Sequence, residues 1–166
     1  KIFRTKGSAA ILMNVNNGNI LSLVSLPDFD LNKREKIDDV NYINRVTKGV
    51  FELCTVLKTF TIAAGLNEEV ITPEEEFKKK KKKIWCAGKP IGEYDDKISS
   101  NLTVEQILVR SGNIGSVRIG QRVGENNLKS FLNDIGVLNK IEFDIEEVGQ
   151  PIPFRWGKCK LATVSF

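Results

Sequence analysis

Thr55 and Lys58 place a hydroxyl and an amine three residues apart at the start of an apolar stretch, and this stretch constrains the fold most. Its residues leave little helix surface suited to water, so we expect a helix at about residues 55–66 inside a domain. Residues three apart lie on one face of a helix, with Cβ atoms about 5–6 Å apart, so the two groups can hydrogen-bond. Burial also lowers the pKa of a lysine and favours its neutral form. The pair therefore meets the needs of a nucleophile and its proton acceptor.

A second polar motif, Ser111-Gly-Asn113, follows after an interval long enough for a helical lobe. Thr103-Val-Glu-Gln106 has the form of a capping box, so we expect a short helix that leads to Ser111 and a further helix beginning at or after Asn113. A serine-x-x-lysine motif followed by a serine-x-asparagine type motif belongs to the signature of penicillin-binding proteins and β-lactamases. Taken alone, the first motif also fits an ordinary buried helix whose lysine reaches the surface.

Two apolar runs at residues 9–15 and 20–26 are joined by Asn16-Asn-Gly-Asn19, and Asn-Gly is a strong hairpin signal. Both runs are nearly continuously apolar, so we expect strands that are covered on both faces. Later in the chain, apolar residues at helical intervals predict a helix that ends at Gly136. These apolar positions are Leu128, Phe131, Leu132 and Ile135.

Several segments match one family in the same order along the chain. They are residues 7–15, 17–30, 44–45, 51–52, 102–103 and 149–166, together with the two polar motifs. On these segments the chain resembles the transpeptidase domain of class B penicillin-binding proteins, the membrane-anchored enzymes that cross-link peptidoglycan in cell division and elongation. The resemblance is weakest at residues 71–100. It implies the mixed α/β fold of penicillin-recognising enzymes, in which helices sandwich a sheet beside a helical lobe, and residues 149–166 resemble the approach to a later strand-and-loop segment.

Departures from the family pattern concern the site and the extent of the domain. Cys54 and Thr55 stand where the family has glycine and the nucleophilic serine, and the third motif, lysine-threonine-glycine, is absent. The chain also begins at the first strand of the domain, without the membrane anchor or the pedestal region. We therefore interpret residues 1–166 as a single partial transpeptidase domain, an interior fragment that lacks the C-terminal strands and whose activity is impaired.

The resemblance implies a role in acyl transfer for each motif residue. Thr55 takes the place of the nucleophile and Lys58 accepts its proton. Ser111 passes a proton toward the leaving amine, and Asn113 binds the backbone of the substrate. The implied substrate is a peptidoglycan stem peptide ending in D-alanyl-D-alanine, β-lactams are the implied inhibitors, and no cofactor or metal is needed.

The resemblance also implies a location and a set of partners. The parent protein is expected at the periplasmic face of the bacterial inner membrane, attached only through the missing N-terminal anchor. Its expected protein partners are cell-wall synthesis or divisome proteins. The fragment itself is expected to be soluble, since it has no run of about 18 apolar residues.

The charge distribution argues against nucleic acid as a partner. The formal net charge is +4, but residues 78–83 are six consecutive lysines, and the rest of the chain carries a small excess of acidic residues. Such a run is most often an exposed, mobile surface segment. The three cysteines, Cys54, Cys86 and Cys159, show no CxxC spacing and the chain has no histidine, so a zinc site is not expected.

Alternatives to a transpeptidase stay open. A catalytically inactive homologue would act as a scaffold or binding subunit of a cell-wall assembly, and Thr55 in place of serine favours it. A β-lactamase or β-lactam sensor would use the same fold, and a nucleic-acid-binding module would use residues 78–83. Within the enzyme interpretation, the Cys54 thiol is an alternative nucleophile, because it lies four residues before Lys58 on the same helix face.

Overall fold

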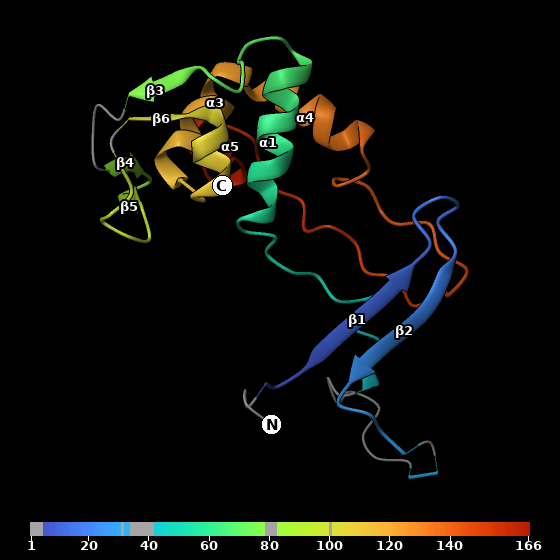
Figure 1. Cartoon of the computed structure of the whole chain (residues 1–166). Helices are drawn as coiled ribbons and strands as arrows, with labels where there is room; N and C mark the ends of the chain where they lie inside the picture. The colour runs from blue at the N-terminus through green and yellow to red at the C-terminus, as the bar shows by residue number, and fades with distance from the viewer. Residues whose placement is uncertain (1–4, 31, 34–41, 79–82, 100) are drawn as a thin grey trace. The chain divides into compact units, whose positions relative to one another are not determined.

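The computed structural model describes residues 5–30, 32–33, 42–78, 83–99 and 101–166 (Figure 1). The chain divides into two compact units, one formed by Lys1–Phe51 and Asn139–Ile152 and the other by Glu52–Leu138 and Pro153–Phe166. Helices and strands both occur, which confirms the mixed α/β class expected from the sequence. The interpretation of residues 1–166 as one partial domain stays a prediction.

The first unit contains a hairpin formed by β1 (Ser8–Met13) and β2 (Ile20–Leu26), which pair antiparallel. The Asn17 side chain accepts a hydrogen bond from the backbone N–H of Asn19 at 3.0 Å. Gly18, between them, has a φ of +75°, in the left-handed region that favours glycine. The hairpin predicted from the Asn-Gly pair is therefore confirmed.

The prediction that both faces of this hairpin are covered is wrong. All six residues of β1 are exposed, and Leu12 and Leu21 expose 58% and 64% of their surface. A continuous apolar run becomes buried only where further layers of structure cover the sheet. In the described residues the strands form three separate two-stranded sheets, and the sandwiched sheet expected from the sequence is not completed by them.

The second unit is mainly helical and holds the hydrophobic core. Its longest helices are α1 (Val56–Asn67), α3 (Asn113–Val123) and α4 (Glu125–Asp134), and Figure 1 shows α1 beside α3. A Cβ added to Gly65 of α1 would lie 2.6 Å from Ile71 Cδ1, so the glycine leaves room for the Ile71 side chain to pack against this helix. Helices α1 and α3 are in contact and form one packed framework for residues at their ends.

The local predictions for the second unit are confirmed. The helix expected at residues 55–66 is α1, and α3 begins at Asn113. In the capping box before α2 (Val104–Val109), the Gln106 N–H donates to Thr103 Oγ1 at 3.2 Å and the Thr103 N–H donates to Gln106 Oε1 at 3.1 Å. Helix α4 stops just before Gly136, which has a φ of +81°.

Four strands and one helix of this unit were not specified from the sequence. Strand β3 (Glu76–Lys78) pairs with β6 (Asn101–Thr103), and β4 (Lys83–Cys86) pairs with β5 (Lys89–Gly92). Helix α5 (Lys158–Val164) lies in the segment read as the approach to a strand and loop. Leu161 and Ala162 of this helix are buried, so core packing fixes it where no long periodic pattern is visible.

The structure also bears on the lysine run, the apolar segments and the cysteines that the composition singled out. Lys78 and Lys83, the ends of the lysine run, are exposed, while residues 79–82 lie outside the described residues. Within the part of the chain that the structure describes, no helix combines the length and hydropathy needed to cross a bilayer. The three cysteines are free, and a hydrogen bond with Cys159 raises the pKa of Cys86 to about 11.

Candidate active site

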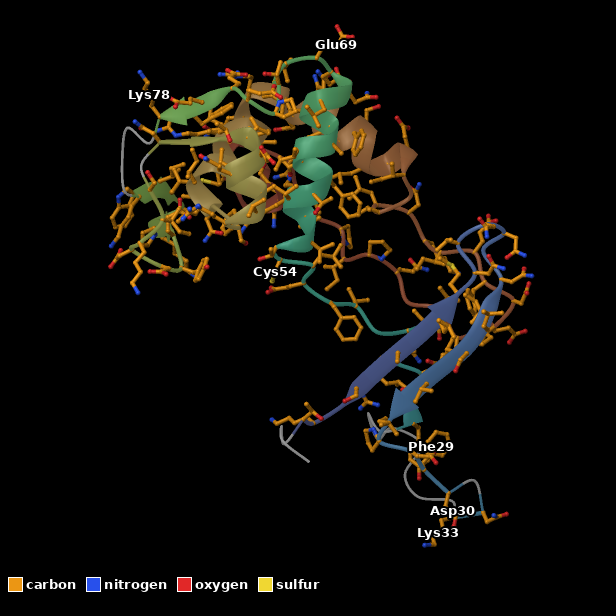
Figure 2. All side chains as sticks on the ribbon, viewed as in Figure 1. Phe29, Asp30, Lys33, Cys54, Glu69 and Lys78 are labelled. Atoms are coloured by element: carbon orange, nitrogen blue, oxygen red, sulfur yellow. The ribbon has the colours of Figure 1, made fainter. Side chains whose placement is uncertain are left out.

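Helix α1 carries the first motif into the core of the second unit. Thr55 is the residue before the first turn of the helix and is exposed, whereas Lys58, in the first turn, exposes only 2% of its surface. Figure 2 labels Cys54 where the chain enters α1 and Glu69 beyond the opposite end. A lysine is almost never this buried unless its amine has polar partners.

The Lys58 amine has three such partners, all in the second motif. Its Nζ donates to the Ser111 backbone oxygen at 2.8 Å, to Ser111 Oγ at 2.8 Å and to Asn113 Oδ1 at 2.6 Å. Ser111 has a φ of +55°, an uncommon conformation for a residue other than glycine. This conformation presents both its carbonyl and its hydroxyl to the same amine.

Asn113 is held from the other side by Gly92, the last residue of β5, and by Glu93, which follows it. Its side-chain Nδ2 donates to the Gly92 backbone oxygen at 2.8 Å, which leaves Oδ1 to accept from Lys58. Its backbone N–H donates to Glu93 Oε2 at 2.6 Å, and the N–H of Ile114 donates to Glu93 Oε1 at 3.2 Å. The orientation of the Asn113 amide is therefore fixed at both of its ends.

The electrostatic surroundings act on the Lys58 amine in two directions. Burial lowers the pKa of Lys58, while the nearby charges of Glu93 and Cys54 raise it, and the net change is a pKa below the ordinary value of 10.5. Burial is the larger effect because the side chain is almost completely removed from water. A lowered pKa increases the neutral fraction of the amine, which is the form that accepts a proton.

The structure brings three of the four predicted site residues into direct contact. Lys58, Ser111 and Asn113 form one hydrogen-bonded cluster, and Thr55 lies one helical turn before Lys58. Among the described residues, no hydrogen bond joins the Thr55 hydroxyl to the Lys58 amine, and the bond between these residues runs from the Lys58 N–H to the Thr55 backbone oxygen at 3.2 Å. The catalytic roles of all four remain predictions.

Cys54 shows why the turn before α1 favours glycine. Its φ is +48°, in the left-handed region where a Cβ is strained. The backbone here therefore has a conformation for which glycine is suited. The side chain is exposed, which leaves the thiol accessible.

Sequence reasoning missed Gly92 and Glu93. They lie about 20 residues before the second motif, in the region where the resemblance is weakest, and their contacts depend on how β5 packs beside the start of α3. One partial signal is visible in the sequence: Gly112, just before α3, has no side chain with which to cap the helix. Such a helix end needs hydrogen-bond acceptors from elsewhere.

Comparison with known proteins identifies the family. The profile described as "Penicillin binding protein transpeptidase domain" matches residues 8–166. The chain belongs to this family. It is 28% identical to the probable peptidoglycan D,D-transpeptidase FtsI of Caulobacter vibrioides over 99% of its own length, and 27% identical to the stage V sporulation protein D of Bacillus subtilis over the same share. The chain spans only 28% and 26% of the lengths of these two relatives.

Solved structures support the same fold. A protein from Burkholderia ambifaria described as a peptidoglycan glycosyltransferase superposes with a TM-score of 0.80 and 23% identity. The transpeptidase domain of penicillin-binding protein 3 from Burkholderia pseudomallei superposes with a TM-score of 0.77 and 24% identity. Each match covers 96% of this chain and less than half of the other, 47% and 44% respectively. The expected penicillin-binding transpeptidase fold, incomplete within this chain, is thus confirmed.

Proposed function

We propose that this chain provides part of the active site of a peptidoglycan D,D-transpeptidase that forms an acyl-enzyme and binds β-lactams. The observation that carries the proposal is the buried Lys58 amine, hydrogen-bonded to Ser111 Oγ and Asn113 Oδ1 and with a lowered pKa. An ordinary lysine that reaches the surface would place its amine in water. Here the amine is enclosed by the residues that the mechanism requires.

In the proposed reaction, Thr55 Oγ attacks the carbonyl carbon of the penultimate D-alanine of a stem peptide. The hydroxyl proton passes to neutral Lys58 Nζ as the new C–O bond forms, and backbone N–H groups stabilise the oxyanion. The C–N bond then breaks, and Ser111 passes a proton to the departing D-alanine amine while Lys58 reprotonates Ser111. An amine of a second stem peptide then attacks the ester carbonyl. Its proton passes through Ser111 and Lys58 to Thr55 Oγ as the C–O bond breaks, which frees Thr55 and completes the cross-link.

The short Lys58–Ser111 contact supports the second proton transfer. Nζ and Oγ are 2.8 Å apart, within the range of about 2.6–3.2 Å over which a proton passes directly. Asn113, with Nδ2 on Gly92 and Oδ1 on Lys58, holds the amine against Ser111 and is the proposed contact for the peptide backbone of the substrate. We further propose that the protein works on the periplasmic side of the inner membrane with other cell-wall synthesis proteins.

Covalent labelling with a fluorescent penicillin tests this function. The protein as its gene encodes it should become labelled, and Thr55→Ala and Lys58→Ala should each suppress labelling. Peptide mapping then decides the nucleophile, because an ester on Thr55 resists neutral hydroxylamine whereas a thioester on Cys54 is cleaved. A folded protein that takes up no label would exclude acyl transfer and favour a scaffold role, and hydrolytic turnover of a chromogenic cephalosporin would favour a β-lactamase.

A further inference from the structure

The first turn of α3 is capped by a residue from outside the helix. The residue before the helix is Gly112, which provides no side-chain cap. The carboxylate of Glu93 takes this role, with Oε2 accepting from the N–H of Asn113 and Oε1 accepting from the N–H of Ile114. A carboxylate at this end of a helix satisfies free N–H groups and faces the positive end of the helix dipole.

Residues 92 and 93 together hold the second motif at two points. The Gly92 oxygen binds the Asn113 side chain, and the Glu93 carboxylate binds the Asn113 backbone. The remaining acceptor of the Asn113 side chain, Oδ1, binds Lys58 Nζ at 2.6 Å. A continuous set of hydrogen bonds therefore runs from the end of β5 through Asn113 to the amine of Lys58.

We infer that Glu93 is a positioning residue for the proposed acyl transfer: its carboxylate fixes the start of α3 and so holds Asn113 and the Lys58 amine in their reactive arrangement. The catalytic consequence of this inference rests on the proposed function. The structural and electrostatic link between Glu93 and Lys58 is independent of that function and can be measured separately.

The same carboxylate also acts on Lys58 through its charge. Two titratable groups act electrostatically on the amine, Glu93 after β5 and Cys54 before α1, and both raise the pKa of Lys58 against the larger effect of burial. The groups in direct contact with the amine, from Ser111 and Asn113, are neutral. Removing the charge of Glu93 should therefore lower the pKa of Lys58 further.

A purely structural cap and a positioning residue predict different results for Glu93→Gln. A glutamine keeps the length of the side chain but has one acceptor oxygen and places an NH₂ group against a backbone N–H. Loss of the charge shifts the Lys58 titration in either case. If Glu93 only stabilised α3, the variant would lose stability and keep the wild-type maximal labelling rate once Lys58 is neutral. If it positions the site, this maximal rate falls as well.

The control is Glu125→Gln. Glu125 is the acidic residue in the first turn of α4, so this substitution removes the same charge from another helix start without touching the Lys58 cluster. Both variants are made in the protein as its gene encodes it. The pKa of Lys58 is measured by NMR of ¹³Cε-labelled lysine, with the Lys58 signal assigned by its loss in Lys58→Met, and penicillin labelling is measured as a function of pH.

Glu93→Gln should lower the pKa of Lys58 and reduce the maximal labelling rate by about tenfold to a hundredfold, a typical effect of misplaced catalytic groups. Since neutral Lys58 accepts the proton, the acid limb of the labelling profile should move to lower pH. Glu125→Gln should change neither. An unchanged maximal labelling rate in folded Glu93→Gln, an unchanged Lys58 titration in it, or equal effects in both variants would overturn the inference.

Glu93→Asp decides the matter if the glutamine variant does not fold. It keeps the charge but shortens the side chain, so the Lys58 pKa should stay near that of the wild type while the labelling rate falls. A labelling rate equal to the wild type would refute the positioning role. If the wild type takes up no penicillin, the proposed function fails, and the Lys58 titration in these variants still confirms or refutes the link to Glu93.

Discussion

Replacing Lys58 with methionine should separate stability from chemistry at this site. The substitution removes three hydrogen bonds and leaves two acceptors with fixed positions, the Ser111 carbonyl oxygen and Asn113 Oδ1, without a donor. Each buried unsatisfied group costs about 1–3 kcal/mol. The same substitution removes a buried positive charge, whose desolvation costs several kcal/mol even in a relaxed protein. Because these effects oppose each other, the free energy of unfolding should change by less than about 3 kcal/mol at neutral pH.

The effect of Lys58→Met on acylation has no such compensation. A thioether accepts a proton far less readily than an amine, and a positioned general base contributes about 10²–10⁴ in rate. We therefore expect penicillin labelling to fall by at least a hundredfold in a protein that still unfolds cooperatively in urea. Labelling within about threefold of the wild type, in a variant of normal stability, would refute the role of Lys58 as the proton acceptor.

Three further predictions concern the same cluster. Folding lowers the pKa of Lys58, so between the folded pKa and 10.5 the unfolded chain binds more protons than the folded chain. The free energy of unfolding of the wild type, measured in urea, should therefore rise with pH across this window. The Lys58→Met variant should lack this rise. Ser111→Gly and Ser111→Ala both lose the hydroxyl that binds Lys58 and should both reduce labelling, and Ser111→Gly should have the higher melting temperature of the two because glycine adopts the φ of +55° without strain. Cys54→Gly combined with Thr55→Ser should label about tenfold to a hundredfold faster than the parent if the threonine methyl crowds the site by about 1–3 kcal/mol, and an equal rate would contradict that reasoning.

The sequence predicted those parts of the fold that local rules control. The Asn-Gly turn, the Thr103 capping box and the glycine after α4 act over a few residues, and each occurs where its pattern stands. Burial of the β1–β2 hairpin would depend instead on layers formed by distant segments. The apolar run alone therefore led to the wrong prediction that both faces are covered. Helix α5 is short, and its place is decided by burial of Leu161 and Ala162.

The candidate site was predictable to the extent that it consists of motifs. The spacing from Thr55 to Lys58 predicts one helix face, and the second motif supplies the partners of the amine. Glu93 was not predictable in this way, because a carboxylate that caps a helix about 20 residues later has no fixed spacing. Its role follows from packing between β5 and α3, which becomes visible only in the folded chain.

The two strained residues beside Lys58 differ in what their strain achieves. Ser111 adopts a left-handed φ and directs two oxygens to the amine, so hydrogen bonds offset a conformational cost of about 1–2 kcal/mol. Cys54 also adopts a left-handed φ, but its side chain is exposed and no hydrogen bond from it is seen among the described residues. The turn before α1 therefore has a backbone conformation suited to glycine while it carries a cysteine, and its strain has no compensating side-chain hydrogen bond among the described residues.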